Sequence, residues 1–143
     1  RSGLIVDLGC GYGAISHWLA QAGPERKLLG VDCDPDRIRV ARCAAHDSRQ
    51  MTFETQDVRT WPLPECRAVL LLDVMDGFAA AEAAALLEKV FRSLSEGGRL
   101  ILRGVPSLAD SGTEAAAGDY GAKLRNLGFS AVERMGRTFV AIK

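Results

Sequence analysis

The chain has 143 residues, which is the size of one domain and is long enough to bury a substantial hydrophobic core. Apolar residues make up 48% of it and charged residues 25%, a globular composition. No apolar run approaches the roughly 18 residues of a membrane span. Lysine plus arginine equal aspartate plus glutamate at 18 each, so no net positive field attracts nucleic acid or anionic lipid. A membrane span and a nucleic-acid partner are both disfavoured.

Four cysteines and two histidines show no metal-binding or disulfide pattern, since no C-x-x-C pair occurs and no histidine lies at ligand spacing. They are Cys10, Cys33, Cys43, Cys66, His17 and His46. Reduced thiols and a cytoplasmic location are expected. The sequence opens at Arg1, shows no signal peptide and reaches an apolar strand almost at once, so we expect one domain over residues 1–143 that lacks an N-terminal cap segment.

Strands and helices are predicted to alternate along the first half of the chain. Leu4–Leu8 is an apolar strand that enters a glycine-rich turn, and a helix with one apolar face follows from Ala14 to Gly23-Pro24. Residues 28–31 form the second strand. Asp34-Pro35 then supplies an N-cap and a first-turn proline for a helix through about residue 45.

The middle of the chain continues the alternation. Residues 51–55 and 68–72 are two further predicted strands, joined by a loop that contains Trp61. Apolar residues then keep helical spacing from Ala83 to Leu94, and the helix is expected to continue to Gly97-Gly98. Residues 99–102 are the fifth strand.

The last part of the chain differs, because a loop over residues 104–118 and a short helix closed by Gly128 precede two adjacent strands. The two strands, at 129–134 and 138–142, are separated only by residues 135–137, too few for a parallel crossover. They should form an antiparallel hairpin. The expected fold is α/β and doubly wound, with a mostly parallel seven-stranded sheet, an antiparallel C-terminal hairpin strand and helices on both faces.

The glycine turn after the first strand favours a ligand site at the carboxyl edge of the sheet. Two interpretations compete there. Gly9, Gly11 and Ala14 satisfy the dinucleotide pattern G-x-G-x-x-G/A, with Asp32 close to the spacing of a ribose-binding carboxylate. The glycine pattern alone does not decide between a nicotinamide cofactor and another adenosyl ligand.

The longer sequence motif around the turn is more specific. The segment 6–13, VDLGCGYG, resembles the first motif of class I S-adenosylmethionine-dependent methyltransferases. Segments 30–35 and 56–58 look like that family's second strand with its acidic end and its adenine-side motif. Segments 70–76 and 94–102 look like its fourth strand and its helix, turn and fifth strand. The resemblance covers nearly the whole chain, and the family's antiparallel final strand agrees with the expected hairpin.

The resemblance implies S-adenosyl-L-methionine as cofactor and assigns its parts to residues of this chain. Gly9, Gly11 and Gly13 would let the backbone approach the ligand, and Gly11 would lie closest to it. Asp32 would accept hydrogen bonds from both ribose hydroxyls. Asp57 and Val58 would contact the adenine, with Cys33 as an apolar wall, and Cys10 would be a small residue of the loop. Asp7 would orient the loop or contact the ammonium of the ligand, and Asp73 and Met75 would lie at its methionine end. Loop capping is the structural alternative for Asp7 and Asp73, and ordinary packing is the alternative for Cys33 and Val58 as apolar walls.

The implied reaction is in-line displacement of the methyl group, for which geometry is the main requirement. No catalytic residue is assigned, because Asp73, Asp76 and His17 qualify only by type. The fourth strand lacks the Asn/Asp-Pro-Pro-Tyr/Phe signature of family members that methylate DNA bases, so a small-molecule acceptor is expected. Trp61, Phe78, Tyr120 and the loop 104–118 are the candidate acceptor walls. A non-catalytic cofactor-binding module and a nicotinamide-dependent oxidoreductase are the alternatives, and the oligomeric state is left open.

Overall fold

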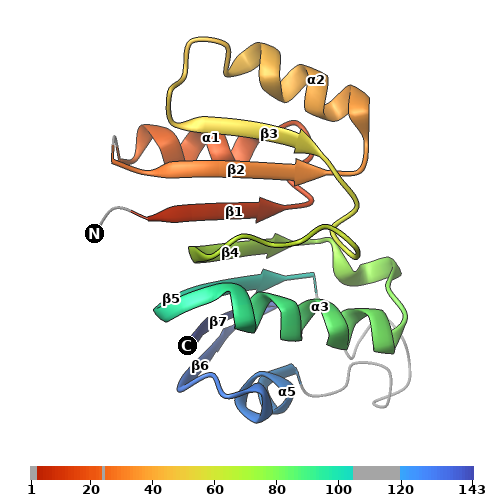
Figure 1. Cartoon of the computed structure of the whole chain (residues 1–143). Helices are drawn as coiled ribbons and strands as arrows, with labels where there is room; N and C mark the ends of the chain where they lie inside the picture. The colour runs from red at the N-terminus through yellow and green to blue at the C-terminus, as the bar shows by residue number, and fades with distance from the viewer. Residues whose placement is uncertain (1–2, 24, 105–119) are drawn as a thin grey trace.

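The computed structural model describes residues 3–23, 25–104 and 120–143. They form one seven-stranded sheet of order β3-β2-β1-β4-β5-β7-β6 (Figure 1). The strands are β1 (Leu4–Leu8), β2 (Lys27–Asp32), β3 (Met51–Thr55), β4 (Cys66–Leu72), β5 (Leu94–Arg103), β6 (Ala131–Met135) and β7 (Thr138–Ile142). β7 runs antiparallel to both of its neighbours, and the other strand pairs are parallel. The predicted fold class, including the reversed strand of the C-terminal hairpin, is confirmed.

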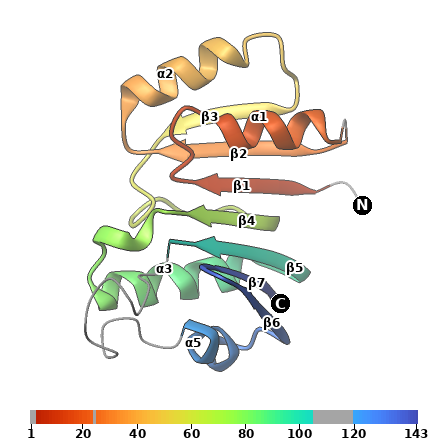
Figure 2. The ribbon, with the colours of Figure 1, turned by 180° about the vertical axis from the view of Figure 1, so that it is seen from behind.

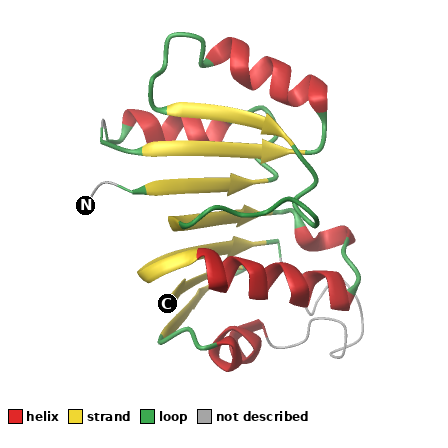
Figure 3. Ribbon diagram, viewed as in Figure 1, coloured by secondary structure: helices red, strands yellow, loops and turns green. Residues whose placement is uncertain are grey.

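Helices cover both faces of the sheet. They are α1 (Ala14–Gln21), α2 (Pro35–Ala44), α3 (Ala80–Ser93) and α5 (Tyr120–Leu127), and a short 3₁₀ turn, η1, spans Met75–Gly77. α3 lies in front of the sheet in Figure 1 and behind it in Figure 2, whereas α1 lies behind and then in front. Helices and strands of the described chain thus lie in separate layers (Figure 3).

Two hydrophobic clusters hold these layers together. The larger one joins the central strands to α3 and α5 and includes Val6, Leu71, Leu87, Leu100 and Leu124, each at most 1% exposed. The smaller one packs α2 on the other face and consists of Ile38, Ala41, Ala45 and Phe53. Near-continuous apolar strands of this kind are typical of a parallel sheet covered on both faces.

Helix termini follow the local signals in the sequence. The carboxylate of Asp34 accepts hydrogen bonds from the backbone N–H groups of Asp36 and Arg37, at 2.9 and 3.2 Å, and Pro35 occupies the first turn of α2. Gly128, with φ of +105°, follows α5, and the N–H of Phe129 reaches back to the carbonyl of Leu124. Both helix ends agree with the prediction.

The end of α3 differs from the expectation. The helix stops at Ser93, and Leu94 begins β5 instead of ending the helical stripe. Leu94 pairs with Cys66 of β4, and a register shift lies between this pair and the next one. Gly97, with φ of +64°, falls inside the irregular strand and donates its N–H to the carbonyl of Lys143. The prediction was wrong because Leu94 is buried equally well from a strand, so the apolar spacing continues past the true helix end.

The hairpin is also tighter than expected. Met135 pairs directly with Thr138, so only Gly136 and Arg137 form the turn. Gly136 adopts φ of +61°, as a tight two-residue hairpin turn requires. β6 starts at Ala131, because Phe129 is buried in the large cluster ahead of the strand. No helix of the described residues has the length and apolar character needed to cross a membrane.

The strand order places a ligand crevice between β1 and β4. From β1 the chain winds outward through β2 to β3, and it then returns to build β4 and β5 on the opposite side of β1. Parallel strands diverge to the two sides at this position, so the loops at their carboxyl ends separate. The site described below lies at these ends.

Candidate binding site at the carboxyl edge of the sheet

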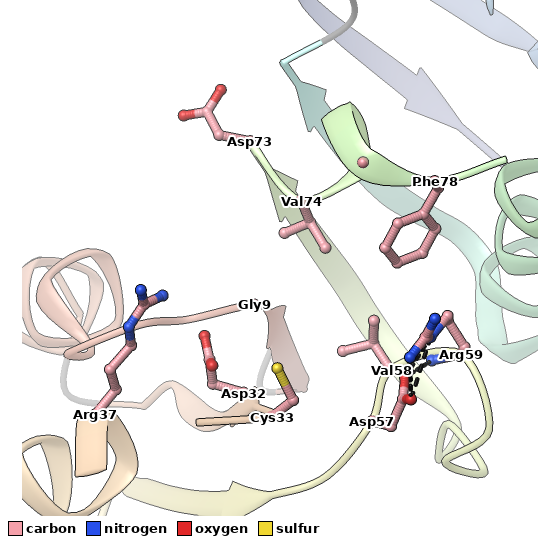
Figure 4. A pocket seen from close by; sticks show the side chains of 11 residues that line it. Gly9, Asp32, Cys33, Arg37, Asp57, Val58, Arg59, Asp73, Val74 and Phe78 are labelled. Carbon is pink, nitrogen blue, oxygen red and sulfur yellow. Dashed lines mark hydrogen bonds and ion pairs between the residues drawn. The ribbon is translucent and has the colours of Figure 1, made fainter. Parts of the chain in front are cut away.

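A cavity of about 370 Å³ opens at the carboxyl ends of β1, β2 and β4. Residues from the loops after these strands, from the loop after β3 and from the start of α2 line it (Figure 4). They are Gly9, Asp32, Cys33, Arg37, Asp57, Val58, Arg59, Asp73, Val74, Gly77 and Phe78. Its volume lies in the range of small-molecule sites, and its position matches the switch point of the sheet.

The three glycines of the first loop have different local reasons for lacking a side chain. Gly9, Gly11 and Gly13 all have positive φ, at +70°, +55° and +79°. A β-carbon on Gly9 would overlap a methyl group of Val74, and one on Gly13 would come within 2.8 Å of the Phe53 ring. A β-carbon on Gly11 would meet no protein atom within 4 Å. Gly13 therefore serves helix packing, Gly9 lies against a wall of the cavity, and backbone conformation explains Gly11.

Asp32 joins the end of β2 to the glycine loop. Its Oδ2 accepts the N–H of Gly11 and its Oδ1 the N–H of Asp34, both at 2.9 Å. Only 6% of the residue is exposed, yet it lines the cavity. Two backbone donors thus hold a buried carboxylate in one orientation at the cavity floor.

Asp7 lies on β1 beneath the glycine loop and outside the cavity lining. Its Oδ2 accepts a hydrogen bond of 2.8 Å from the hydroxyl of Ser16, and both residues are buried. Burial raises the pKa of Asp7 to about 6, against the lowering effect of the Ser16 hydroxyl. In the described structure this carboxylate ties β1 to α1, which agrees with a role in orienting the loop.

Replacing Asp7 by asparagine should stabilise the cofactor-free protein at neutral pH. Because the folded-state pKa is raised, the stability linked to Asp7 is fully present below its unfolded pKa and is lost as pH rises to about 6. The free energy of unfolding of the variant, relative to the parent, should rise from near zero at low pH to about 2–3 kcal/mol at pH 8. Urea melts across this range measure it.

The matched variant is Ser16→Ala, which removes the group that lowers the pKa of Asp7. In Ser16→Ala, the fall in the free energy of unfolding with rising pH should extend to a higher pH than in the parent. A difference between Asp7→Asn and the parent that stays constant with pH would contradict the buried, titrating carboxylate.

Asp57 and Val58 line the cavity from the loop after β3, beside Arg59 (Figure 4). The Asp57 carboxylate forms an ion pair with Arg59, in which Nη2 lies 2.7 Å from Oδ2 and Nε lies 3.0 Å from Oδ1. These hydrogen bonds lower the pKa of Asp57 to about 2. Val58 is buried at 8% exposure, and its side chain joins the large apolar cluster. Asp57 is therefore ionised and oriented by the adjacent guanidinium.

Asp73 follows β4 with a φ of +58°, the left-handed conformation, which is otherwise confined to glycines in the described residues. Arg103 of β5 holds it through Nε and Nη2 at 3.0 and 2.6 Å from Oδ2. A β-carbon on Gly104 would come within 2.7 Å of the Asp73 Cα. The sequence-predicted Asp73 does line the cavity, with much of its charge matched by Arg103.

The remaining predicted residues divide between the cavity and its surroundings. Cys33 is exposed and lines the cavity, whereas Met75 is 5% exposed and packs in the large apolar cluster. Cys10 is partly buried beside the smaller cluster. Burial, with Asp7 and Asp32 nearby, raises the pKa of the Cys10 thiol to about 12, so it is no nucleophile at neutral pH.

Four lining residues were not identified from the sequence: Arg37, Arg59, Val74 and Gly77. Arg59 stands two positions after Asp57, and Arg37 three after Asp34, spacings at which opposite charges meet. Of the expected acceptor walls, Phe78 lines the cavity, while Trp61 and Tyr120 pack against the large cluster. Residues 105–118 of the expected acceptor loop lie outside the described residues.

The comparisons with known proteins agree with this geometry. The family described as methyltransferase domain matches residues 5–98. The carboxy-S-adenosyl-L-methionine synthase of Psychrobacter arcticus is 32% identical over 107 residues, covering 71% of this chain and 41% of that protein. The trans-aconitate 2-methyltransferase of Rhizobium meliloti is 30% identical over 102 residues, covering 71% and 38%.

A solved structure is similar over nearly the whole chain. Magnesium protoporphyrin IX methyltransferase from Synechocystis PCC 6803, with bound S-adenosylmethionine, has a TM-score of 0.79 and 29% identity. The alignment covers 98% of this chain and 69% of that one. The chain belongs to the class I S-adenosylmethionine-dependent methyltransferase family, as its motifs predicted. It spans about two fifths of the length of the curated relatives named above.

Proposed function

We propose that the cavity binds S-adenosylmethionine and that the domain transfers its methyl group to a small molecule. The observation that carries the proposal is the meeting of three separate segments at one cavity. Gly9 comes from the first loop, Asp32 from the end of β2, and Asp57 with Val58 from the loop after β3. These are the positions to which the family resemblance assigned the loop, ribose and adenine contacts.

The ligand is proposed to lie with its ribose over Asp32 and its adenine beside Val58. Asp32 has two oriented oxygens, each with further lone pairs for a ribose hydroxyl. The Asp57 carboxylate retains acceptor capacity for the adenine amino group beside Arg59. The methionine end would then extend past Gly9 towards Asp73, a lining residue that Arg103 holds from outside the lining.

Methyl transfer in this site needs alignment more than acid–base chemistry, because the sulfonium of the cofactor already activates the methyl group. Asp73 is engaged by Arg103, and His17 stacks on Phe53, at a centroid distance of 5.9 Å, away from the cavity lining. We propose that the chain's own residues bind and orient the two reactants and that acceptor deprotonation is not their task.

A small-molecule acceptor is supported by the names of the relatives and by the balanced charge. Relatives include a trans-aconitate 2-methyltransferase and, from Hahella chejuensis, a malonyl-acyl-carrier-protein O-methyltransferase. The chain carries no net charge that would draw it to nucleic acid. We further propose that residues 1–143 act as one cytoplasmic domain, since the large cluster joins the central strands to α3 and α5 and all four cysteines are free thiols.

Ligand choice tests the proposal directly. S-adenosylmethionine and S-adenosylhomocysteine should each raise the melting temperature, whereas NAD should not, because a ligand stabilises only the state that binds it. At a ligand concentration of about 100 times Kd the expected stabilisation is about 2.7 kcal/mol. Thermal-shift titration followed by calorimetry measures it. Stabilisation by NAD alone would replace the methyltransferase proposal with the nicotinamide alternative, and cofactor binding without transfer to any acceptor would identify a non-catalytic module.

A further inference from the structure

The loop after β3 contains a hydrogen-bonded turn. The backbone N–H groups of Thr60 and Trp61 both donate to the carbonyl of Asp57, at 3.1 and 2.9 Å. This turn, residues 57–61, carries two of the lining residues proposed to contact adenine. A short isolated turn is unstable in water, so its shape must be maintained by contacts with the rest of the protein.

Lys89 of α3 supplies one such contact from behind the cavity. Its ammonium donates to the carbonyls of Val58, Arg59 and Trp61, at 2.6, 3.0 and 2.9 Å. An ammonium group has three N–H donors, so these three carbonyls satisfy it completely. Lys89 is partly buried, and burial lowers its pKa while the nearby Asp57 opposes the change. The residue is not part of the cavity lining.

Arg59 supplies a second contact on the cavity side. Besides its ion pair with Asp57, its Nη1 lies 3.4 Å from Oε1 of Glu82, and its guanidinium lies 5.9 Å from the centre of the Phe78 ring. Glu82 in turn accepts the N–H of Ala79 at the start of α3. The turn is therefore attached to α3 at two places, through Lys89 and through Glu82.

We propose that Lys89 is a positioning residue that sets both the affinity and the adenine selectivity of the cofactor site by holding turn 57–61 against α3. This inference rests on the proposed placement of adenine beside Asp57 and Val58. The Lys89 ammonium fixes the three peptide planes before the ligand binds. The conformational entropy of the turn is therefore lost during folding and does not weaken binding. Without the ammonium, the partly buried carbonyls of Val58 and Trp61 lose their partner, and the turn must rearrange to expose them to water.

The experiment compares Lys89→Met with Lys143→Met, because both lysines cap carbonyls next to α3. Lys143 donates to the carbonyls of Leu94 and Arg92, at 2.6 and 3.4 Å, at the C-terminal end of the helix. Methionine keeps an apolar stem of similar length in each variant and removes the charge. Calorimetry gives Kd for S-adenosylhomocysteine and for S-inosylhomocysteine, in which an oxygen replaces the adenine amino group.

The parent should prefer the adenosyl over the inosyl ligand by about tenfold or more, as expected for a hydrogen bond to a charged group. Lys89→Met should raise the Kd for S-adenosylhomocysteine by about tenfold and bring the ratio of the two Kd values close to one. Lys143→Met should keep the parent ratio even where it lowers the melting temperature. Hydrogen exchange of the Thr60 and Trp61 amides should accelerate only in Lys89→Met.

The possible failures are distinguishable. A parent that binds neither ligand refutes the proposed function itself. A parent that binds both equally overturns the adenine placement and this inference with it. A selective parent whose ratio and amide exchange persist in Lys89→Met overturns the role of Lys89 alone. If Lys89→Met does not fold, Lys89→Arg replaces it, and an unchanged ratio of Kd values with unchanged amide exchange would count against the inference, since a planar guanidinium cannot match the three carbonyls.

Discussion

Asp32→Ala is expected to weaken binding of S-adenosylhomocysteine by about 1.5–3 kcal/mol, the range for hydrogen bonds to a charged group. The carboxylate would lose the ribose hydroxyls, and the N–H of Gly11 would lose its acceptor in the glycine loop. Both losses act on binding, while the core clusters do not include Asp32. Calorimetry on the folded variant measures the change.

Asp34→Ala is the matched control, since this neighbouring carboxylate also accepts backbone N–H groups. It caps α2 and does not line the cavity. Its loss should lower the free energy of unfolding by about 1 kcal/mol and leave the affinity close to that of the parent. A folded Asp32→Ala protein with parental affinity would refute the ribose assignment.

Gly11→Val is expected to abolish detectable cofactor binding at concentrations that saturate the parent. Gly11 does not itself line the cavity, but its N–H holds the Asp32 carboxylate that does, so in the proposed placement a branched side chain here would lie beside the ribose of the ligand. Overlap with the ligand costs roughly 1–3 kcal/mol or more and adds to the loss of the ribose contacts at Asp32, while the left-handed φ of +55° strains the free protein as well. Asp57→Ala, which removes one side-chain contact, should have the smaller effect on binding.

Gly136→Val is the control that separates the effect of backbone strain on stability from the effect of Gly11→Val on ligand binding. Gly136 has φ of +61°, and a β-carbon added there, as at Gly11, would have no protein atom within 4 Å. The two variants should therefore lose a similar free energy of unfolding, about 1–2 kcal/mol, as judged by denaturant melts. Only Gly11→Val should lose the ligand. If it binds S-adenosylhomocysteine as the parent does, Gly11 serves chain reversal alone and the cofactor lies elsewhere.

Local signals along the chain specify the order and type of the elements. An apolar run that ends in a glycine turn marked β1, and the Asp34 cap with Pro35 marked the start of α2. The short connection around Gly136 required an antiparallel pair whatever the rest of the fold. Asp32 and Val58 were identifiable because their sequence motifs place them after predicted strands. The carboxyl ends of parallel strands meet at one edge of the sheet.

Tertiary structure alone decided where elements end and which side chains meet. Leu94 could satisfy a helical or an extended pattern, and pairing with Cys66 selected the strand. Lys89 lies about 30 positions from the carbonyls it holds, and Arg103 lies 30 from Asp73. Contacts of that separation depend on how α3 and β5 pack against β4, which no local pattern encodes. Met75 is buried in the large cluster, and the packing of α1 on β1 brings Ser16 to Asp7, so neither of these two motif residues lines the cavity.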